Sequence, residues 1–201
     1  MKIILASNSP RRKELLKGLD IDFEVRVIPD IDESYPPDLP PDEIPCYIAQ
    51  KKAAAYHTSM QSDELIITAD TVVVLDGDIL EKPVDKNDAI RMLKRLSGRK
   101  HQVITAVTLT TIDKQHSFSV NSYVDFAKLT GEEIEYYVDN YKPYDKAGAY
   151  GIQEWIGYVG VRSIEGSFYN VMGLPIQRLY QELKKNENYS LPLHRKLKLR
   201  I

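Results

Sequence analysis

The sequence predicts an α/β fold with α+β character, built on one curved mixed β-sheet that is flanked by helices. Residues 65–69 and 71–75 form an apolar, β-branched run that only Asp70 interrupts, which is typical of strands buried on both faces. Residues 103–112 and 117–129 alternate between apolar and polar side chains, as the strands of an antiparallel pair do. Helical patterns lie between these strands, so the class is mixed rather than all-β.

The N-terminal half begins with a strand and a helix. The pattern predicts, in order, a strand at 2–6, a helix from Ser9-Pro10 to about Gly18, a strand at 23–28, a loop at 29–42 and a helix at 43–58. Serine suits the N-cap of a helix and proline suits its first position. Five prolines between residues 29 and 42 exclude regular structure there.

Turn and capping signals organise the remainder of the chain. Asp76-Gly77 predicts a hairpin back into 79–80, and the Thr130–Glu133 capping box opens a helix. The further elements expected are a helix at 85–96, the strands at 103–112 and 117–129, a helix to about residue 140, short strands in the glycine-rich segment 148–160, and a final helix at 171–185.

Length and composition limit the functional classes. The chain has 201 residues and a formal net charge of −2, so we expect one domain at 1–186 and no general binding of polyanions. A basic tail, 187–201, follows, and a solvated tail is favoured over contact with nucleic acid or membrane lipids. The single cysteine, Cys46, excludes an intrachain disulfide and a cysteine-rich zinc site. The sequence has no signal peptide and no membrane-length apolar run, which predicts a cytoplasmic protein.

The segment around Ser9 is the most informative for binding. Arg11 and Arg12 place positive charge in the first turn of a helix, where a sequence selected only for stability would carry Asp or Glu. Serine hydroxyls, free backbone N–H groups and guanidinium forks together suit a chain of phosphates. The alternative is a pair of arginines that simply faces solvent.

Asp70 is the second informative residue. A buried carboxylate needs a partner, because an unpaired charge in the interior costs several kcal/mol. It could hold a divalent cation or act as a general base on water. The alternative is a carboxylate that caps a loop at the end of a strand.

Four further residues carry weaker signals. Lys52, Lys82 and Glu33 mean little by themselves, whereas Gln153 lies in a stretch of small residues and offers one donor and one acceptor group.

Together and in this order, these segments resemble the Maf family of nucleoside triphosphate pyrophosphatases. The matching stretches are Ala6-Ser-Asn-Ser-Pro-Arg-Arg12, Glu14-Leu-Leu16, Glu33, Ala49-Gln-Lys-Lys-Ala53, Ala69-Asp-Thr-Val72, Glu81-Lys-Pro83, Leu96-Ser-Gly98, His101-Gln-Val103, Thr105-Ala-Val107, Asp145-Lys-Ala-Gly-Ala-Tyr-Gly-Ile-Gln153 and Gly173-Leu-Pro175. The resemblance covers residues 3 to about 184. It implies an elongated two-lobed fold with a deep central cleft, related to the inosine-triphosphate pyrophosphatases, and members that are often dimers.

The resemblance also implies roles for individual residues. Arg12, Thr71 and Gln153 mark the branch of the family that hydrolyses dTTP and UTP. The implied assignments are Asp70 as the catalytic residue, Ser9, Arg11, Lys52 and Lys82 as phosphate-binding residues, Arg12, Thr71 and Gln153 as specificity residues, and Glu33 with Asp70 as ligands of Mg²⁺ or Mn²⁺. In chemical terms, the Gln153 amide can accept from the imide N–H of uracil or thymine and donate to one carbonyl, while Arg12 donates to the other.

The implied reaction is metal-assisted attack of water on the α-phosphorus of a nucleoside triphosphate, which gives the monophosphate and pyrophosphate. CTP or modified pyrimidine triphosphates are further candidate substrates, and the implied cellular role is nucleotide-pool housecleaning or arrest of cell division. The competing class is a non-catalytic regulator of septum formation that binds nucleotides or nucleic acid. Walker, Gly-x-Gly-x-x-Gly and Gly-x-Ser-x-Gly motifs are absent from the sequence, which argues against other common nucleotide and ester chemistry.

Overall fold

The computed structural model describes residues 1–185, in which seven strands form one mixed sheet. The strands are β1 (Lys2–Leu5), β2 (Phe23–Val25), β3 (Glu64–Leu75), β4 (Asp78–Leu80), β5 (Lys100–Thr110), β6 (Gln115–Phe126) and β7 (Val161–Glu165). The helices are α1 (Pro10–Lys17), α2 (Ile44–Ala54), α3 (Lys86–Leu96), α4 (Gly131–Tyr141), the 3₁₀ turn η1 (Ala147–Ala149), α5 (Trp155–Gly160), α6 (Phe168–Val171) and α7 (Ile176–Lys184). The α/β class predicted from the sequence is confirmed.

Three long strands form the spine of the molecule. The strand order is β2-β1-β3-β5-β6-β7, with β4 paired to β3 outside this path. β3 runs parallel to β1 but antiparallel to β5, so the sheet is mixed. β3 is buried on both faces along nearly all of its 12 residues, which explains its continuous apolar sequence.

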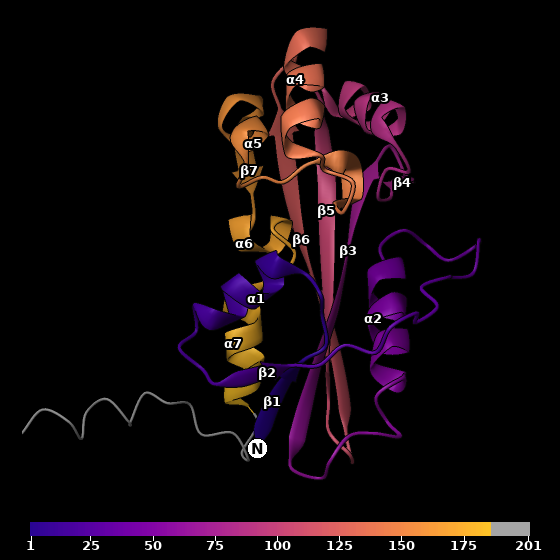
Figure 1. Ribbon diagram of the computed structural model, residues 1–201, viewed down its shortest axis with the longest axis vertical. Coiled ribbons are helices and arrows are strands. Elements are labelled where there is room, and N and C mark those ends of the chain that lie inside the picture. Colours follow the sequence, from indigo (N-terminus) through magenta and orange to yellow (C-terminus); the bar gives the residue numbers. More distant parts are fainter. Residues whose placement is uncertain (186–201) are drawn as a thin grey trace, which may run out of the picture.

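The helices gather in two groups at the two ends of these strands. Figure 1 shows α3, α4 and α5 at one end and α1, α2 and α7 at the other, with β3, β5 and β6 running through both. At the second end, α1 and α7 pack on one face of the sheet and α2 packs on the opposite face. We call these groups the upper and lower lobes.

Alternation along β3 decides which face each side chain meets. Ala69 and Val73 belong to the main core, with the apolar side chains of α1 and α7, whereas Val72 and Val74 pack with Ile48 of α2. Because successive strand residues point to opposite faces, Asp70 lies on the α2 face and Thr71 on the α1 face.

Most of the predicted elements are present. Ser9 caps α1, Pro10 begins it, and the Thr130–Glu133 capping box is formed as expected. Two elements are shorter than predicted, since β2 ends at Val25 and α2 ends at Ala54. The predicted tail, 187–201, lies outside the described residues. Within residues 1–185, every helix is too short or too polar to cross a lipid bilayer.

Asp70 lies within β3 beside Lys52, so the alternative of a carboxylate that caps a loop at the end of a strand does not hold. Two predictions of local structure were wrong. The segment 148–160 contains no strand but the turn η1 and helix α5, and β7 follows it. The final helix is divided into α6 and α7 by a turn at Gly173, whose φ of 111° ends a helix.

Gly157 explains why the segment 148–160 was misread. A side chain here would place its Cβ 1.7 Å from the carbonyl oxygen of Ile152, so the glycine lets α5 approach the backbone that precedes it. The sequence alone does not display this contact, and its glycines suggested short strands.

We therefore expect Gly157→Ala to lower the free energy of unfolding by about 1–3 kcal/mol, since the backbone around Ile152 must move. Gly131→Ala is the matched control, because a Cβ at Gly131 meets no atom within 4 Å. It should change stability by less than about 1 kcal/mol. Urea denaturation of both variants tests this, and equal stability of the two would contradict the account.

Candidate active site

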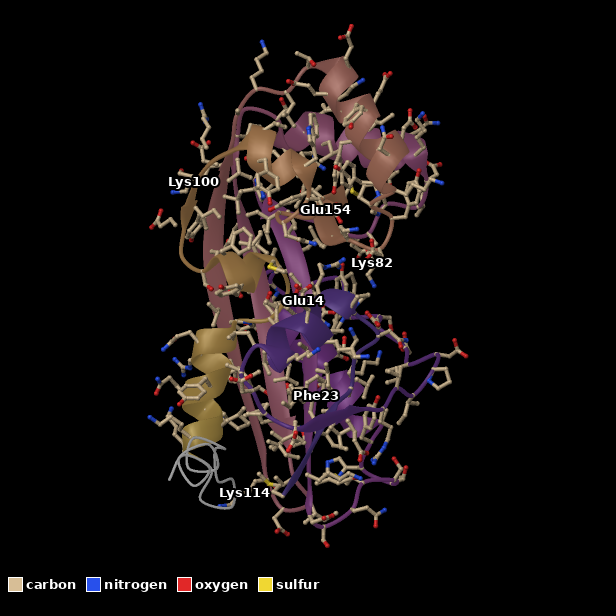
Figure 2. The ribbon with its side chains drawn as sticks, turned by 60° about the vertical axis from the view of Figure 1, so that its left-hand side comes forward. Glu14, Phe23, Lys82, Lys100, Lys114 and Glu154 are labelled. Carbon is tan, nitrogen blue, oxygen red and sulfur yellow. The ribbon has the colours of Figure 1, made fainter. Side chains whose placement is uncertain are left out.

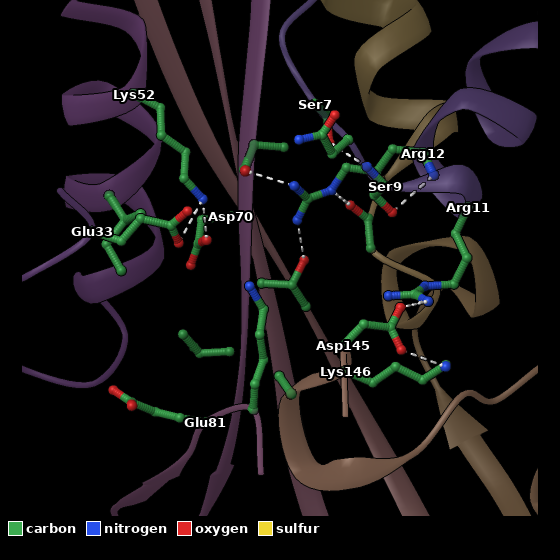
Figure 3. A pocket seen from close by; sticks show the side chains of 18 of the residues that line it. Ser7, Ser9, Arg11, Arg12, Glu33, Lys52, Asp70, Glu81, Asp145 and Lys146 are labelled. Atoms are coloured by element: carbon green, nitrogen blue, oxygen red, sulfur yellow. Dashed lines mark hydrogen bonds and ion pairs between the residues drawn. The ribbon is translucent and has the colours of Figure 1, made fainter. Parts of the chain in front are cut away.

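A cavity of about 750 Å³ lies between the two lobes. It brings together every site residue that the sequence singled out: Ser9, Arg11, Arg12, Glu33, Lys52, Asp70, Thr71, Lys82 and Gln153. These residues come from segments that are distant in the sequence, and β3 crosses the middle of the cavity. Figure 3 shows Lys52, Glu33 and Asp70 on one side of that strand and Ser7, Ser9 and Arg12 on the other.

On the α2 side, an ammonium group stands between two carboxylates. Lys52 Nζ lies 2.8 Å from Asp70 Oδ1 and 3.0 Å from Glu33 Oε2. Burial raises the pKa of Asp70, the positive charges of Lys52 and Arg12 oppose that shift, and the Glu33 carboxylate adds to it. A carboxylate with a raised pKa is a stronger base than one in water, which suits a proton acceptor.

Local contacts hold the groups of this cluster in place. The hydroxyl of Thr68, two residues before Asp70 on β3, donates to the carbonyl of Ala49 at 2.7 Å and so ties the strand to α2. Lys51 Nζ binds the loop on either side of Glu33, at 2.6 Å from Asp32 Oδ2 and 2.9 Å from the Ser34 carbonyl. The loop that carries Glu33 is therefore fixed, although its prolines exclude regular structure.

On the α1 side, Arg12 binds both neighbours of Asp70, the backbone carbonyl of Ala69 and the side chain of Thr71. Its guanidinium donates to Ala69 O at 2.8 Å, to Thr71 Oγ1 at 3.0 Å and to Gly173 O at 2.8 Å. Three of its five N–H groups thus have acceptors in the protein. Arg12 connects the start of α1, the centre of β3 and the turn before α7.

The start of α1 presents hydroxyl and amide groups to the cavity. Ser9 Oγ accepts from the Arg12 backbone N–H at 3.4 Å, and Ser7 Oγ accepts from the Ser9 N–H at 3.2 Å. Among residues 1–185 neither hydroxyl donates to a protein acceptor, so both protons remain available to a ligand. No acidic side chain lies in the first turn of α1, so the helix N-terminus adds to the positive field.

Two contacts join the lobes across the cavity. Arg11 Nη1 of the lower lobe lies 2.8 Å from Asp145 Oδ2 of the upper lobe, and the Tyr35 hydroxyl donates to Glu81 Oε1 at 2.7 Å. Burial raises the pKa of Asp145, but hydrogen bonds to Lys146 and Arg11 outweigh it and lower the pKa to about 2. Lys82 lines the cavity from the upper lobe, and Figure 2 shows it at the level where the lobes meet.

Gln153 carries an unused acceptor. Its Oε1 atom is buried and has no hydrogen-bond partner among residues 1–185. A buried acceptor without a partner is costly, and a ligand N–H would remove that cost.

Sequence reasoning missed the part played by Asp145, Lys146 and Tyr35. Asp145 and Lys146 lie in a stretch that was recognised for its resemblance, but an adjacent acid and base give no sign of where each side chain points. Lys146 is buried and lies 2.7 Å from Asp145 and 3.2 Å from Glu154. Only the fold shows that this network reaches Arg11 in the other lobe.

The residues present fit a hard divalent cation that is shared with phosphates. Residues 1–185 contain no cluster of three or more side chains able to ligate a metal by themselves. Mg²⁺, however, is commonly held by one or two carboxylates together with substrate phosphates, and Glu33 and Asp70 supply two. The ammonium group of Lys52 lies between these two carboxylates, which shows that the pair stabilises positive charge at this point.

Comparison with solved structures supports the fold. The chain is similar to the Ham1 protein of Staphylococcus aureus, with a TM-score of 0.52 and 19% identity over 90% of this chain and 100% of that one. At this identity the similarity concerns the fold alone.

Relatives with much higher identity are named for an activity. A protein from Bacteroides thetaiotaomicron named dTTP/UTP pyrophosphatase is 63% identical over 184 residues, which are 92% of this chain and 95% of that protein. A protein of the same name from Parabacteroides distasonis is 64% identical over 91% of this chain and 95% of its own length. One from Flavobacterium psychrophilum is 50% identical over 89% of this chain and 91% of its own length.

A family model covers almost the whole of the described fold. It is described as "Maf-like protein" and matches residues 2–186, from β1 to the residue after the last one described. The resemblance noted in the sequence is thereby confirmed, and the chain belongs to the Maf-like protein family.

Proposed function

We propose that this protein hydrolyses dTTP and UTP to the nucleoside monophosphate and pyrophosphate. The observation that carries the proposal is a buried carboxylate, Asp70, in a cavity that is also lined by the phosphate-binding candidates Ser9, Arg11, Lys52 and Lys82. A protein that only binds polyanions has little reason to keep such a carboxylate, which favours the enzyme over a non-catalytic regulator. The names of its relatives support the choice of substrates.

The proposed triphosphate site is the cationic rim of the cavity. A nucleoside triphosphate carries a charge near −4, which Arg11, Lys52 and Lys82 would neutralise. Ser9 and the N-terminus of α1 would add neutral donors. Arg11 must exchange Asp145 for a phosphate when the substrate binds, so the contact between the lobes would be rearranged at that moment.

The proposed chemistry is an in-line displacement at the α-phosphorus. Asp70 accepts a proton from the attacking water, the new O–P bond forms, and the bond from the α-phosphorus to its bridging oxygen breaks. Pyrophosphate leaves with its charge held by Arg11 and Lys82. Glu33 and Asp70 would hold Mg²⁺ or Mn²⁺, and such an ion, when bound, neutralises charge on the phosphates.

The proposed base contact uses the unused acceptor of Gln153. Thymine and uracil present one N–H between two carbonyls, and an amide can accept from that N–H while it donates to one carbonyl. Arg12 and Thr71 are proposed to influence selectivity as well, and Arg12 would do so chiefly through Gly173 and Thr71, which it already binds.

The setting of this activity is part of the proposal. The catalytic unit would be residues 1–186, in the cytoplasm where the substrates occur, and a homodimer is the expected assembly. Housecleaning of the nucleotide pool and arrest of cell division both suit an enzyme that removes triphosphates.

Asp70→Asn should lower kcat for dTTP at least about a hundredfold, because the amide cannot accept the proton of water. Nucleotide affinity should remain, since the substitution removes negative charge. Asp139→Asn is a suitable control, because this carboxylate is exposed and bound to Lys86 on the upper lobe. Pyrophosphate release measures both variants, and near-wild-type turnover of Asp70→Asn would exclude the assigned role.

Gln153→Ala should lower kcat/KM for dTTP and UTP about 10–100-fold and reduce the preference for them over GTP, since one bidentate base contact is lost. Gln115→Ala is the control, because Gln115 is exposed and lies outside the cavity. Release of pyrophosphate from a panel of triphosphates gives the ratios. An unchanged dTTP/GTP ratio in Gln153→Ala would show that another group reads the base.

A further inference from the structure

Four residues form a chain of hydrogen bonds that begins at the cavity and ends in the core. Arg12 Nη2 donates to Thr71 Oγ1 at 3.0 Å, and Thr71 Oγ1 lies 3.0 Å from Thr105 Oγ1. Thr105 Oγ1 in turn donates to the Asn170 carbonyl at 2.9 Å. Thr71 lies on β3 and Thr105 lies opposite it on β5, whereas Asn170 belongs to α6.

Counting protons fixes the direction of every bond in this chain. A guanidinium can only donate and a carbonyl can only accept, while each threonine hydroxyl owns a single proton. The proton of Thr105 is committed to the Asn170 carbonyl. The proton between the two threonines must therefore belong to Thr71, which leaves the Thr71 hydroxyl with no proton for a ligand.

The inner part of this chain of hydrogen bonds is shielded from water. Thr105 and Asn170 are both completely buried. The Asn170 side chain is itself fixed, with Nδ2 at 3.2 Å from the Val103 carbonyl and 3.0 Å from Ser122 Oγ. Buried hydrogen bonds without competing water keep their donor and acceptor direction, so the arrangement is a stable property of the fold.

Hydroxyl groups in the cavity consequently fall into two kinds. Ser9 accepts a hydrogen bond from the backbone and keeps its proton, so it can donate to a phosphate oxygen. Thr71 lines the same cavity but can only accept. An acceptor oxygen of the ligand placed beside Thr71 Oγ1 would be repelled by the lone pairs of that hydroxyl. A donor group of the ligand at the same place would form a hydrogen bond with it.

We propose that Thr105 is a positioning residue that makes Thr71 an acceptor, so that the cavity selects at this point for a hydrogen-bond donor of the nucleoside. The imide N–H of the base is already assigned to Gln153 Oε1, so the donor at Thr71 is a hydroxyl of the sugar. This inference rests on the proposed function and names a determinant of selectivity that acts without touching the substrate.

The test compares Thr105→Val, which removes the acceptor of the Thr71 proton, with the wild-type protein. The substrates are dTTP, N3-methyl-dTTP and 2′,3′-dideoxy-TTP. In the wild type, 2′,3′-dideoxy-TTP, which lacks the sugar hydroxyl, should lose about tenfold or more in kcat/KM. A loss with N3-methyl-dTTP reports instead on Gln153 and should be the same in Thr105→Val. In Thr105→Val, kcat/KM for dTTP should fall mainly through KM, and the difference between dTTP and 2′,3′-dideoxy-TTP should shrink severalfold.

Two matched variants separate positioning from structure. Thr105→Ser keeps the hydroxyl and should restore wild-type discrimination. Thr108→Val removes an equally buried threonine hydroxyl from the same strand, bonded to Ser117 Oγ at 2.9 Å, and should leave discrimination unchanged.

Each outcome bears on one claim. Undiminished discrimination in Thr105→Val, or the same change in Thr108→Val, would overturn the inference while the proposed function stands. If Thr105→Val does not fold, the wild-type panel decides alone, and equal kcat/KM for dTTP and 2′,3′-dideoxy-TTP would overturn the inference. Absence of pyrophosphate release by the wild type would instead overturn the proposed function.

Discussion

The carboxylate of Asp70, buried in the middle of β3, is the constraint on which the rest of the site depends. An ionised carboxylate in the centre of a sheet is destabilising unless a cation compensates it. Lys52 supplies that cation at 2.8 Å, and the bond from Thr68 to Ala49 keeps α2 close enough for it to do so. Glu33 is then drawn to the other side of the same ammonium group. The need to compensate the charge of Asp70 thus determines where α2 and the loop that carries Glu33 are placed.

Successive side chains of β3 point to opposite faces of the sheet, so the proposed catalytic and recognition groups lie on different faces. Asp70 faces α2 and the acidic loop, where the chemistry is proposed to occur. Its neighbour Thr71 faces α1 and the turn at Gly173, where polarity is set by Arg12 and Thr105. Arg12 binds the backbone at Ala69 and the side chain of Thr71, so a shift of the recognition side would move the catalytic carboxylate as well.

Much of this arrangement could be predicted from the sequence, and the reasons are local. The capping residues Ser9-Pro10 predict the first helix, and the apolar run predicts the buried strand, because both signals depend on adjacent residues. Asp70 stood out as a charge within that run. The family resemblance assigned it a role, and the cavity brings the assigned residues together.

The remainder depends on contacts between distant segments, which one sequence does not display. The glycine-rich segment 148–160 suggested short strands because the contact of Gly157 with the Ile152 carbonyl could not be seen, and the bond between Arg11 and Asp145 spans 134 residues. The chain through Thr105 is hidden for a different reason. Threonine is common in strands, so the sequence does not single out Thr105. Its role follows only from the direction of its hydrogen bonds, which its spatial neighbours determine.

Hydrolysis in ¹⁸O-labelled water tests the central claim most directly, because the position of the label identifies the phosphorus that water attacks. If Asp70 directs water to the α-phosphorus of dTTP, the label should appear in the nucleoside monophosphate and the pyrophosphate should be unlabelled. Label in the pyrophosphate, or release of inorganic phosphate in its place, would contradict the account.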